Sequence, residues 1–422
     1  VTIHAITHFA QSWGIQSRLA VTAPTGSAAL NINGTTLHTF ASLSIYNKAT
    51  KPSAKTNTNK SLDKIAVLVI DEISFVSCSF LNAVNVQLQR RVNRSSSTSA
   101  QTAQLPFGGI TVIFSGDMAQ LPPVSKDGGL PLYHLFRLST SEEQRMIGEK
   151  NPAFCGHKLW RSVTKVVQLT RNYRAETDPL FIDFLDHVRE GRQVTQQHID
   201  ALTERRVTSS LLLVDPPPLG TPMVWFANKD VNFVNSLLVH RNALCLQRLV
   251  YRFPASIREN ISQAGTTSTL GPILTHTSSV HRYSYLVGIM NSQNAKTLPI
   301  ALLDLFIGAT VTLQKDNSLL HHGIANGSEA IFVGTHPPLD ELSTTTETVN
   351  NPDNTKSSVI VVHTLPDFFF FHVPKSNFKF TNLPPQVLPL APHKHTSVKV
   401  HSQLSTSTFV VSQVQVRLFG AT

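Results

Sequence analysis

Apolar and polar positions change their period along the first 170 residues of the chain. Residues 1–16 carry apolar side chains three to four positions apart, which predicts an amphipathic helix. Four strand-sized apolar runs follow, at residues 18–22, 65–70, 110–114 and 163–169. The 65–70 run lacks any alternation, as is typical of a strand covered on both faces in a parallel sheet.

Helical spacing returns between these runs. A short helix is expected from residue 27, and a longer one through Phe80, Leu81, Val84 and Leu88. This alternation predicts an α/β fold with doubly wound parallel sheets. In such sheets ligands bind at the carboxyl ends of the strands, and polar residues follow the apolar runs here.

The pattern weakens in the second half of the chain. Helices are expected over 181–189, 195–205 and around 231–234, and strands over 223–226, 309–313 and 330–333. Three stretches have no clear plan: the Ser/Thr/Gly-rich 255–295, the linker or loop 340–358, and the β-like tail 359–422. We expect a first α/β domain at 1–165, a second with an insertion at 166–340, and a linker with a poorly defined C-terminal segment at 341–422.

Composition narrows the class of partner. The 422 residues hold 36 Lys and Arg against 26 Asp and Glu, a formal charge of +10, which favours nucleic acid; charge alone does not separate this from a solvated basic surface. The three cysteines form no C-x-x-C pair, so neither a disulfide framework nor a zinc site is expected, as suits a reducing compartment. No apolar stretch reaches the roughly 18 residues of a membrane helix.

Carboxylates and an amide follow two of the runs. Asp71 and Glu72 stand after the 65–70 run; in phosphate chemistry the first would hold Mg²⁺, and the second would orient and deprotonate the attacking water. The alternative is a strand end that caps the next helix. Gln120 follows a Gly-Asp pair after the next run and suits a contact to a γ-phosphate or its water, whereas a tight turn explains the neighbouring Gly and Pro residues.

Arg174 closes the segment at residues 169–174, where the fourth run ends. An arginine there would stabilise charge on the transferring phosphoryl group across an interdomain cleft, as an arginine finger does. The alternative, in a basic protein, is a surface charge or a salt bridge.

Another polar group follows the first run and comprises Pro24, Thr25, Gly26, Thr36 and His38. Backbone N–H groups, hydroxyls and an imidazole suit a nucleic-acid backbone and a stacked base. The alternative is a strand-to-helix turn with an ordinary buried histidine.

Taken in order, these segments resemble the Pif-family DNA helicases, relatives of RecD in superfamily one B, and especially the Helitron-type variant. The resemblance rests on Ala-Pro-Thr-Gly at 23–26, Asp-Glu-Ile-Ser at 71–74, Phe-Gly-Gly at 107–109, Gly-Asp-Met-Ala-Gln-Leu-Pro-Pro at 116–123, Leu-Thr-Arg-Asn-Tyr-Arg at 169–174 and Asn-Gly at 326–327. It spans about residues 1 to 335. It implies two RecA-like domains with ATP between them, single-stranded DNA across them, and 5′-to-3′ translocation driven by ATP hydrolysis.

The resemblance also implies roles for matched residues. Asp71 matches the metal-binding carboxylate, Glu72 the general base, Gln120 the γ-phosphate-sensing Gln and Arg174 the arginine finger. All four are expected at the ATP site, so ATP and Mg²⁺ are the expected cofactors.

The expected partners are single-stranded DNA and duplex junctions, without a membrane, for a chain that acts as a monomer. The segments similar to the family's DNA-contacting motifs contain Pro24, Thr25, Gly26, Thr36 and His38 in the first domain and Asn228 in the second. A nuclear location is expected from the resemblance and the lack of an export signal.

Two departures qualify this expectation. The family's phosphate-binding loop, G-x-x-x-x-G-K-[ST], is missing, since no Gly-Lys pair occurs and Val1 stands just after the loop's position; residues 398–422 do not resemble the family's last motifs. We therefore expect a helicase fragment that, as given, hydrolyses ATP poorly or not at all. The rival interpretation is an inactive remnant that binds single-stranded DNA. Repair, recombination, telomere maintenance and transposition stay open as pathways.

Overall fold

The computed structural model describes residues 2–43, 64–92, 104–124, 129–148, 150–170, 173, 177–206, 228–261, 269–274, 302–313, 317–350, 356–401, 406–413 and 416–418. The chain divides into two compact units, Val1–Pro216 (unit 1) and Pro217–Thr422 (unit 2). The domain boundaries expected at residues 165 and 340 stay predictions.

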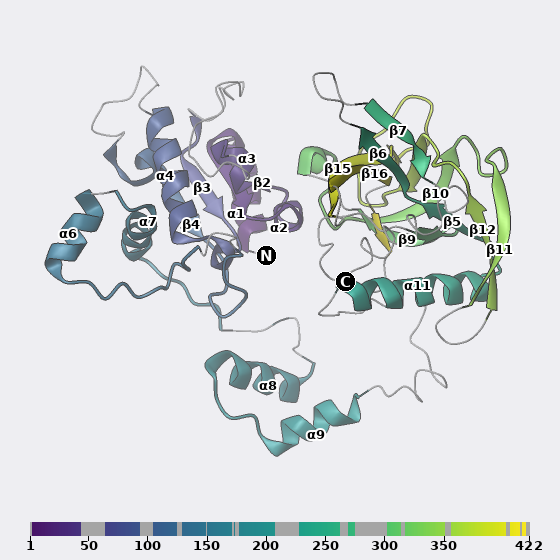
Figure 1. Ribbon diagram of the computed structural model, residues 1–422. Helices are drawn as coiled ribbons and strands as arrows, with labels where there is room; N and C mark the ends of the chain where they lie inside the picture. Colours follow the sequence, from purple (N-terminus) through teal and green to yellow (C-terminus); the bar gives the residue numbers. More distant parts are fainter. Residues whose placement is uncertain are drawn as a thin grey trace. The chain divides into compact units, whose positions relative to one another are not determined.

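Unit 1 contains a four-stranded sheet in the order β2-β1-β3-β4, in which every pair is parallel (Figure 1). Its strands are β1 (Leu19–Ala23), β2 (Thr35–Thr36), β3 (Val67–Ile70) and β4 (Thr111–Phe114). Thr22 lies opposite Ile70, and Ile70 opposite Phe114, so β1, β3 and β4 end at nearly the same level. The predicted α/β fold with a parallel sheet is confirmed.

β3 runs between β1 and β4, and its residues explain that place. Leu68, Val69 and Ile70 are fully buried, as expected for an apolar run without polar alternation. The core of unit 1 gathers apolar side chains from β3, α3 and α4: Leu37, Leu68, Ile70, Leu81, Val84 and Leu88.

Helices precede and follow the strands of this sheet along the chain. They are α1 (Thr2–Ser12), α2 (Gly26–Asn31), α3 (Leu37–Ala41), α4 (Cys78–Val92), α6 (Thr140–Gly148), α7 (Pro152–Arg161), α8 (Pro179–Glu190) and α9 (Gln196–Glu204), with short 3₁₀ turns η1 (Gln16–Arg18), η3 (Ile73–Phe75) and η4 (Pro106–Gly109). The helices predicted at 1–16, 181–189 and 195–205 are thereby confirmed. α7 packs against α4 so closely that a Cβ on Gly156 would overlap the Cys78 carbonyl oxygen.

The strand predicted at residues 163–169 is wrong: this segment forms no strand. Val166, Val167 and Leu169 are each about four-fifths exposed, at 84%, 86% and 79%. An apolar run becomes a strand only beside another strand that completes its hydrogen bonds. None of the strands that the structure describes pairs with this segment.

The described residues of unit 2 form one long helix, α11 (Asn228–Cys245), and three sheets in the orders β14-β13-β10-β9-β17, β11-β12-β5-β8 and β15-β16-β6-β7 (Figure 1). Its strands are β5 (Val250–Pro254), β6 (Ser256–Ile261), β7 (Thr269–Leu274), β8 (Leu302–Leu305), β9 (Thr310–Leu313), β10 (Glu329–His336), β11 (Thr344–Asn350), β12 (Lys356–Val362), β13 (Phe368–His372), β14 (Val387–Leu390), β15 (His393–His401), β16 (Thr406–Gln413) and β17 (Val416–Leu418), with η5 (Asn317–His322) before the β10 hairpin. β5 and β12 pair in parallel, and the other strand pairs described in this unit are antiparallel.

Several expectations for this half need correction. The strands at 309–313 and 330–333 are confirmed as β9 and β10, whereas the loop expected at 340–358 contains β11 and the first residues of β12. Cross-strand pairing overrides the Thr- and Asn-rich composition, because β11 pairs with the apolar β12 over its whole length. The poorly patterned 255–295 contains β6 and β7, and the tail contains strands of all three sheets. The strand expected at 223–226 lies outside the described residues.

A buried polar network lies in unit 2 between α11 and three strands. Arg252 of β5 donates to both carboxylate oxygens of Asp304 in β8, at 2.8 and 2.7 Å. His240 of α11 contacts the same carboxylate with Nε2 (3.0 Å) and the Ser357 hydroxyl of β12 with Nδ1 (2.9 Å). The Arg252 and His240 contacts outweigh the desolvation of burial, which alone would raise the pKa of Asp304, and hold that pKa below its usual value.

The hydrophobic core of unit 2 is aromatic. Phe253, Phe332, Phe369 and Phe371 are fully buried, and their rings stack edge to face or tilted. None of the described helices combines the length and the apolar composition that crossing a membrane requires.

Candidate active site

Backbone hydrogen bonds join three successive strand ends in unit 1. The Asp71 amide donates to the Thr22 carbonyl oxygen of β1 at 2.8 Å. The Ile73 amide donates to the Ser115 carbonyl oxygen beyond β4 at 3.0 Å. We call residues 71–74 and 115–120 the strand-end edge, because they form one continuous margin of the sheet.

Gly116 brings the two halves of the strand-end edge into contact. Its φ is +150°, and a Cβ at this position would lie 2.8 Å from the Ile73 nitrogen and 3.4 Å from the Glu72 carbonyl carbon. Only glycine fits such a close approach of two backbones. Gly116, the first residue of the loop at 116–120, therefore lies directly against the Glu72–Ile73 backbone.

Glu72 has an uncommon backbone conformation. With φ 50° and ψ 45° it lies in the left-handed region, at the position before η3, and its side chain does not cap that turn. The Glu72 side chain therefore does not act as a cap of this turn. Non-glycine residues in this region cost conformational energy and gather at functional sites.

Asp117 is the centre of the 116–120 loop. Its Oδ1 accepts the Ala119 amide at 3.0 Å, and its Oδ2 accepts the Gln120 side-chain amide at 3.4 Å. The Gln120 backbone amide donates to the Asp117 carbonyl oxygen at 3.1 Å. Arg189 of α8 donates to both carboxylate oxygens, at 2.8 and 2.5 Å.

Charge and burial compete at Asp117. Partial burial acts to raise the pKa of this carboxyl, but the hydrogen bonds from Arg189 and the Ala119 amide outweigh it, so the pKa of Asp117 lies below its usual value. Asp117 is thus a carboxylate at neutral pH. Gln120 itself is exposed at the outer end of the loop.

The fit of the strand-end edge to Mg²⁺ depends on Asp71. This carboxylate directly follows a buried strand and is only half-buried, so a hard oxygen donor stands at the margin of the sheet. The described residues contain no group of three His, Cys, Asp or Glu side chains able to hold a metal ion. A single carboxylate suits Mg²⁺ that keeps water and substrate phosphates as its other ligands.

Arg174, the expected arginine finger, lies outside the described residues. Its role therefore stays a prediction. Arg189, which the sequence did not single out, is a described arginine that reaches the loop carrying Gln120.

The polar groups proposed for DNA contact have structural tasks in unit 1. Thr25 precedes α2 and accepts the Ala28 amide (3.3 Å), while buried Thr36 precedes α3 and accepts the Thr39 amide (3.3 Å). Gly26 is buried and Pro24 is half-buried in the turn between β1 and α2. This is the strand-to-helix turn that was the alternative, and contact with DNA stays a prediction.

His38 lies in α3 and stacks on Phe80 of α4, with ring centroids 4.2 Å apart. Burial lowers the pKa of His38, so the imidazole is neutral at pH 7. The ring is only half-buried, so the alternative of a packed histidine is met without full burial. Asn228 is the first residue of α11 in unit 2, and nothing further is described of its side chain.

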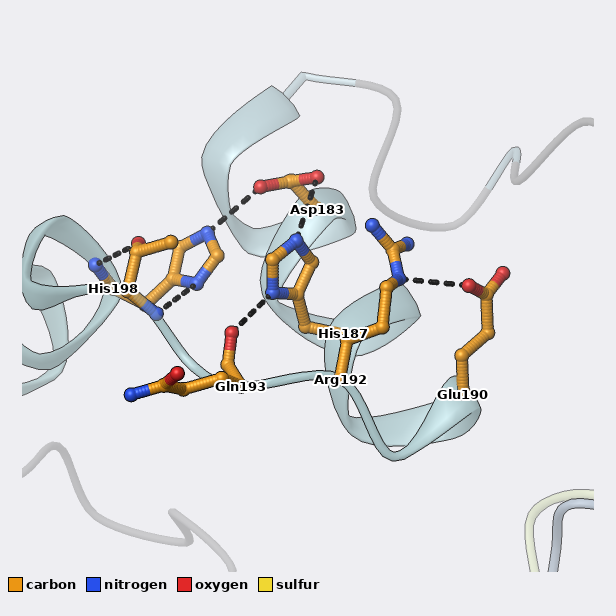
Figure 2. A network of polar contacts seen from close by, with 7 residues as sticks. Asp183, His187, Glu190, Arg192, Gln193 and His198 are labelled. Atoms are coloured by element: carbon orange, nitrogen blue, oxygen red, sulfur yellow. Dashed lines mark hydrogen bonds and ion pairs between the residues drawn. The ribbon is translucent and has the colours of Figure 1, made fainter.

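Helices α8 and α9 are joined by a polar network (Figure 2). His198 of α9 uses Nδ1 to accept the Thr195 amide (3.4 Å), so the proton lies on Nε2, which donates to Asp183 of α8 (2.9 Å). His187 donates from Nδ1 to the Gln193 carbonyl oxygen (2.7 Å). These bonds fix the hairpin that carries Arg189.

Sequence reasoning missed three groups: Arg189, the Asp183–His198 pair and the Asp304 network. Asp304 left a readable signal, since a lone carboxylate in the apolar run Leu-Leu-Asp-Leu indicates a buried charge with a partner. Arg189 left none, because its partner Asp117 lies 72 residues away.

Comparison with known proteins shows a similarity in the first half of the chain. Residues 6–198 match the model of the PIF1-like helicase family, a segment that holds the strand-end edge and α8. This segment, slightly less than half of the chain, is similar to that family.

Two individual helicases are similar to part of the chain. The ATP-dependent DNA helicase PIF1 of Saccharomyces cerevisiae is 33% identical over 200 residues, which are 46% of this chain and 19% of that protein. The ATP-dependent DNA helicase RRM3 of the same species is 32% identical over 181 residues, 41% of this chain and 21% of that protein. The chain thus spans about a fifth of each relative.

A solved structure shows the same fold. The crystal structure of Bacteroides Pif1 bound to ssDNA matches with a TM-score of 0.54 at 18% identity, over 99% of this chain and 75% of that one. This likeness supports the α/β fold class and says nothing further about activity.

Proposed function

We propose that the chain is part of an ATP-dependent DNA helicase that couples ATP hydrolysis to 5′-to-3′ translocation on single-stranded DNA and to duplex unwinding. The strand-end edge carries this proposal, because it places Asp71 and Glu72 beside the loop of Gln120 within the segment that matches the family. The relatives named as ATP-dependent DNA helicases support the reaction class.

Within this proposal each residue has one task. Glu72 orients the attacking water and takes its proton, and Gln120 contacts the γ-phosphate or that water. Asp71 would hold Mg²⁺, which supplies positive charge to the phosphates when bound. Arg174 would stabilise the charge that develops on the transferring group.

Single-stranded DNA would meet the turns at residues 24–26 and 36–38 and the start of α11. The formal charge of +10 supports a polyanionic partner. We also propose that the protein acts as a monomer in the nucleus, in repair, recombination, telomere maintenance or transposition.

The test joins a G-x-x-x-x-G-K-[ST] loop from a related helicase to the N-terminus of the chain, because the printed sequence holds no Gly-Lys pair. ATP turnover is measured with and without single-stranded DNA, and unwinding on duplexes with a 5′ or a 3′ tail. We expect DNA-stimulated turnover and unwinding of the 5′-tailed duplex only. A grafted, folded chain without DNA-stimulated turnover would refute the proposal.

A second candidate is a single-stranded-DNA-binding module without ATP turnover, which the basic charge favours. Fluorescence anisotropy with an oligothymidylate tests it on the chain as given. Binding that weakens steeply with salt, together with no turnover in the grafted chain, would select this candidate.

A further inference from the structure

Arg189 of α8 connects the α8–α9 hairpin to the strand-end edge. Its position in the sequence gives no reason to expect this contact. Its guanidinium meets Asp117 with two N–H groups, at 2.8 and 2.5 Å. A two-point contact of this kind fixes direction as well as distance, which a single charge contact does not.

The Asp117 carboxylate, whose orientation Arg189 fixes, in turn contacts Gln120. Each of its oxygens accepts one bond from Arg189 and one from the loop: Oδ1 from the Ala119 amide and Oδ2 from the Gln120 side chain. Rotation of the carboxylate would therefore break contacts on both sides. The Gln120 backbone amide also depends on Asp117, through its carbonyl oxygen.

Both ends of this link are anchored. Gly116 holds the loop against Ile73, as its close backbone approach shows. On the other side, Asp183 and His198 tie α8 to α9, and Arg205 at the end of α9 contacts Asp178 before α8 at 2.9 Å. Arg189 thus connects two elements that are each internally fixed.

Stability does not explain the pair. The Arg189 side chain is 52% exposed and Asp117 21%, and ion pairs in such surroundings contribute little to folding. The adjacent pair of Arg192 with Glu190, at 2.7 Å, is also exposed and lies at the C-terminal end of α8 itself (Figure 2). It provides a matched control on the same helix end.

We propose that Arg189 is a positioning residue, which orders the 116–120 loop and so fixes Gln120 at the strand-end edge. This inference rests on the proposed function for its consequence in ATP turnover, but not for the ordering itself. The hairpin would in this way report its position to the residue that contacts the γ-phosphate.

Amide hydrogen exchange of the full chain tests the ordering. Arg189→Ala should raise the exchange rates of the Ala119 and Gln120 amides by about tenfold, because the loop would open locally more often. Exchange in α4 and α7 should stay unchanged. Arg192→Ala should leave these amides as in the wild type. Arg189→Lys should give an intermediate rate, since it keeps the charge without the two-point contact.

A double-mutant cycle excludes a general loss of folding. Asp117→Asn keeps an oxygen for the Ala119 amide but removes the charge, and combining it with Arg189→Ala should raise exchange no further than the larger single effect. Additive effects, or unchanged exchange in Arg189→Ala, would overturn the proposal.

Turnover in the loop-grafted chain tests the consequence. Arg189→Ala should lower kcat about tenfold or more with little change in KM for ATP, while Arg192→Ala changes neither. Unchanged kcat despite faster exchange would make Arg189 structural only and overturn the positioning role. If the grafted wild type shows no turnover, the proposed helicase function fails, and the exchange result still decides whether Arg189 orders the loop.

Discussion

Each unit of the molecule contains an aspartate whose carboxylate accepts hydrogen bonds from two N–H groups of an arginine. The two pairs differ in burial. In unit 1 Asp117 and Arg189 are 21% and 52% exposed; in unit 2 Asp304 and Arg252 are 6% and 15% exposed. The first pair joins a loop beside the candidate active site to a helical hairpin. The second joins two strands of a core sheet, with His240 from α11 on the same carboxylate.

The comparison shows that identical chemistry serves two purposes. A charge out of water is tolerated only while its partner is present, so the Asp304 pair specifies how β5, β8 and α11 come together. An ion pair that is still in contact with water contributes little to the stability of the fold. The role that we infer for the Asp117 pair is therefore to position the 116–120 loop. Both carboxyls have pKa values below the usual one, because arginine hydrogen bonds outweigh the desolvation that would raise them.

The largest expected effect is that of Arg252→Ala in unit 2. Removing one partner strands a buried carboxylate, which should cost about 3–5 kcal/mol of stability. Hydrogen exchange of the β5 and β8 amides reads this unit separately from unit 1. Protection equal to the wild type in Arg252→Ala would contradict the structural role of the pair.

Acid should reveal the same pair through Asp304→Asn. At pH 7 we expect this variant to lose about 3 kcal/mol of stability in unit 2. Because the folded pKa of Asp304 is lowered, its contribution is complete above the ordinary aspartate pKa of about 3.9 and disappears as the pH falls through the folded value. The difference in β5 exchange between wild type and Asp304→Asn should therefore shrink below about pH 4; a constant difference down to pH 2 would refute this assignment.

Gly116→Ala should have a smaller, local effect. The new Cβ would meet the Ile73 nitrogen at 2.8 Å, so we expect a loss of about 1–3 kcal/mol and faster exchange at Ile73 and Ser115. Gly191→Ala is a contrast, because its φ is also positive but nothing lies within 4 Å of the added Cβ. Equal exchange at Ile73 in Gly116→Ala and the wild type would speak against the tight junction of the two strand ends.

The smallest effect on stability is expected for Arg189→Ala. Its pair is half exposed, so thermal unfolding should change by less than about 1 kcal/mol. The same variant should nevertheless raise exchange in the 116–120 loop. A loss comparable to that of Arg252→Ala would erase the distinction between the two pairs.

Much of unit 1 could be predicted from the sequence, because its signals are local. The unbroken apolar run at 65–70 specifies a covered strand, and Thr25 and Asp178 mark helix starts. The run at 163–169 has the same local signal but forms no strand, since pairing depends on a neighbour that the run itself does not encode. Unit 2 was harder because its sheets pair strands far apart, such as β5 with β12.

The candidate site was predictable in part for the same reason. Asp71 and Glu72 follow β3 and Gln120 follows β4, as the sequence indicates, and these parallel neighbours end at one level. The arginine that contacts the Gln120 loop, Arg189, comes from an element 72 residues beyond Asp117. No periodicity or spacing in the sequence expresses such a contact.

The most direct measurement of the central claim is ATP turnover by the Glu72→Gln variant of the loop-grafted chain. Replacing a general base by an amide should lower kcat by about 10²- to 10⁴-fold with ATP affinity little changed. Glu204→Gln, at the exposed end of α9, serves as the matched control and should turn over ATP like the wild type. A Glu72→Gln rate equal to that of Glu204→Gln would contradict the assignment of the strand-end edge as the site of hydrolysis.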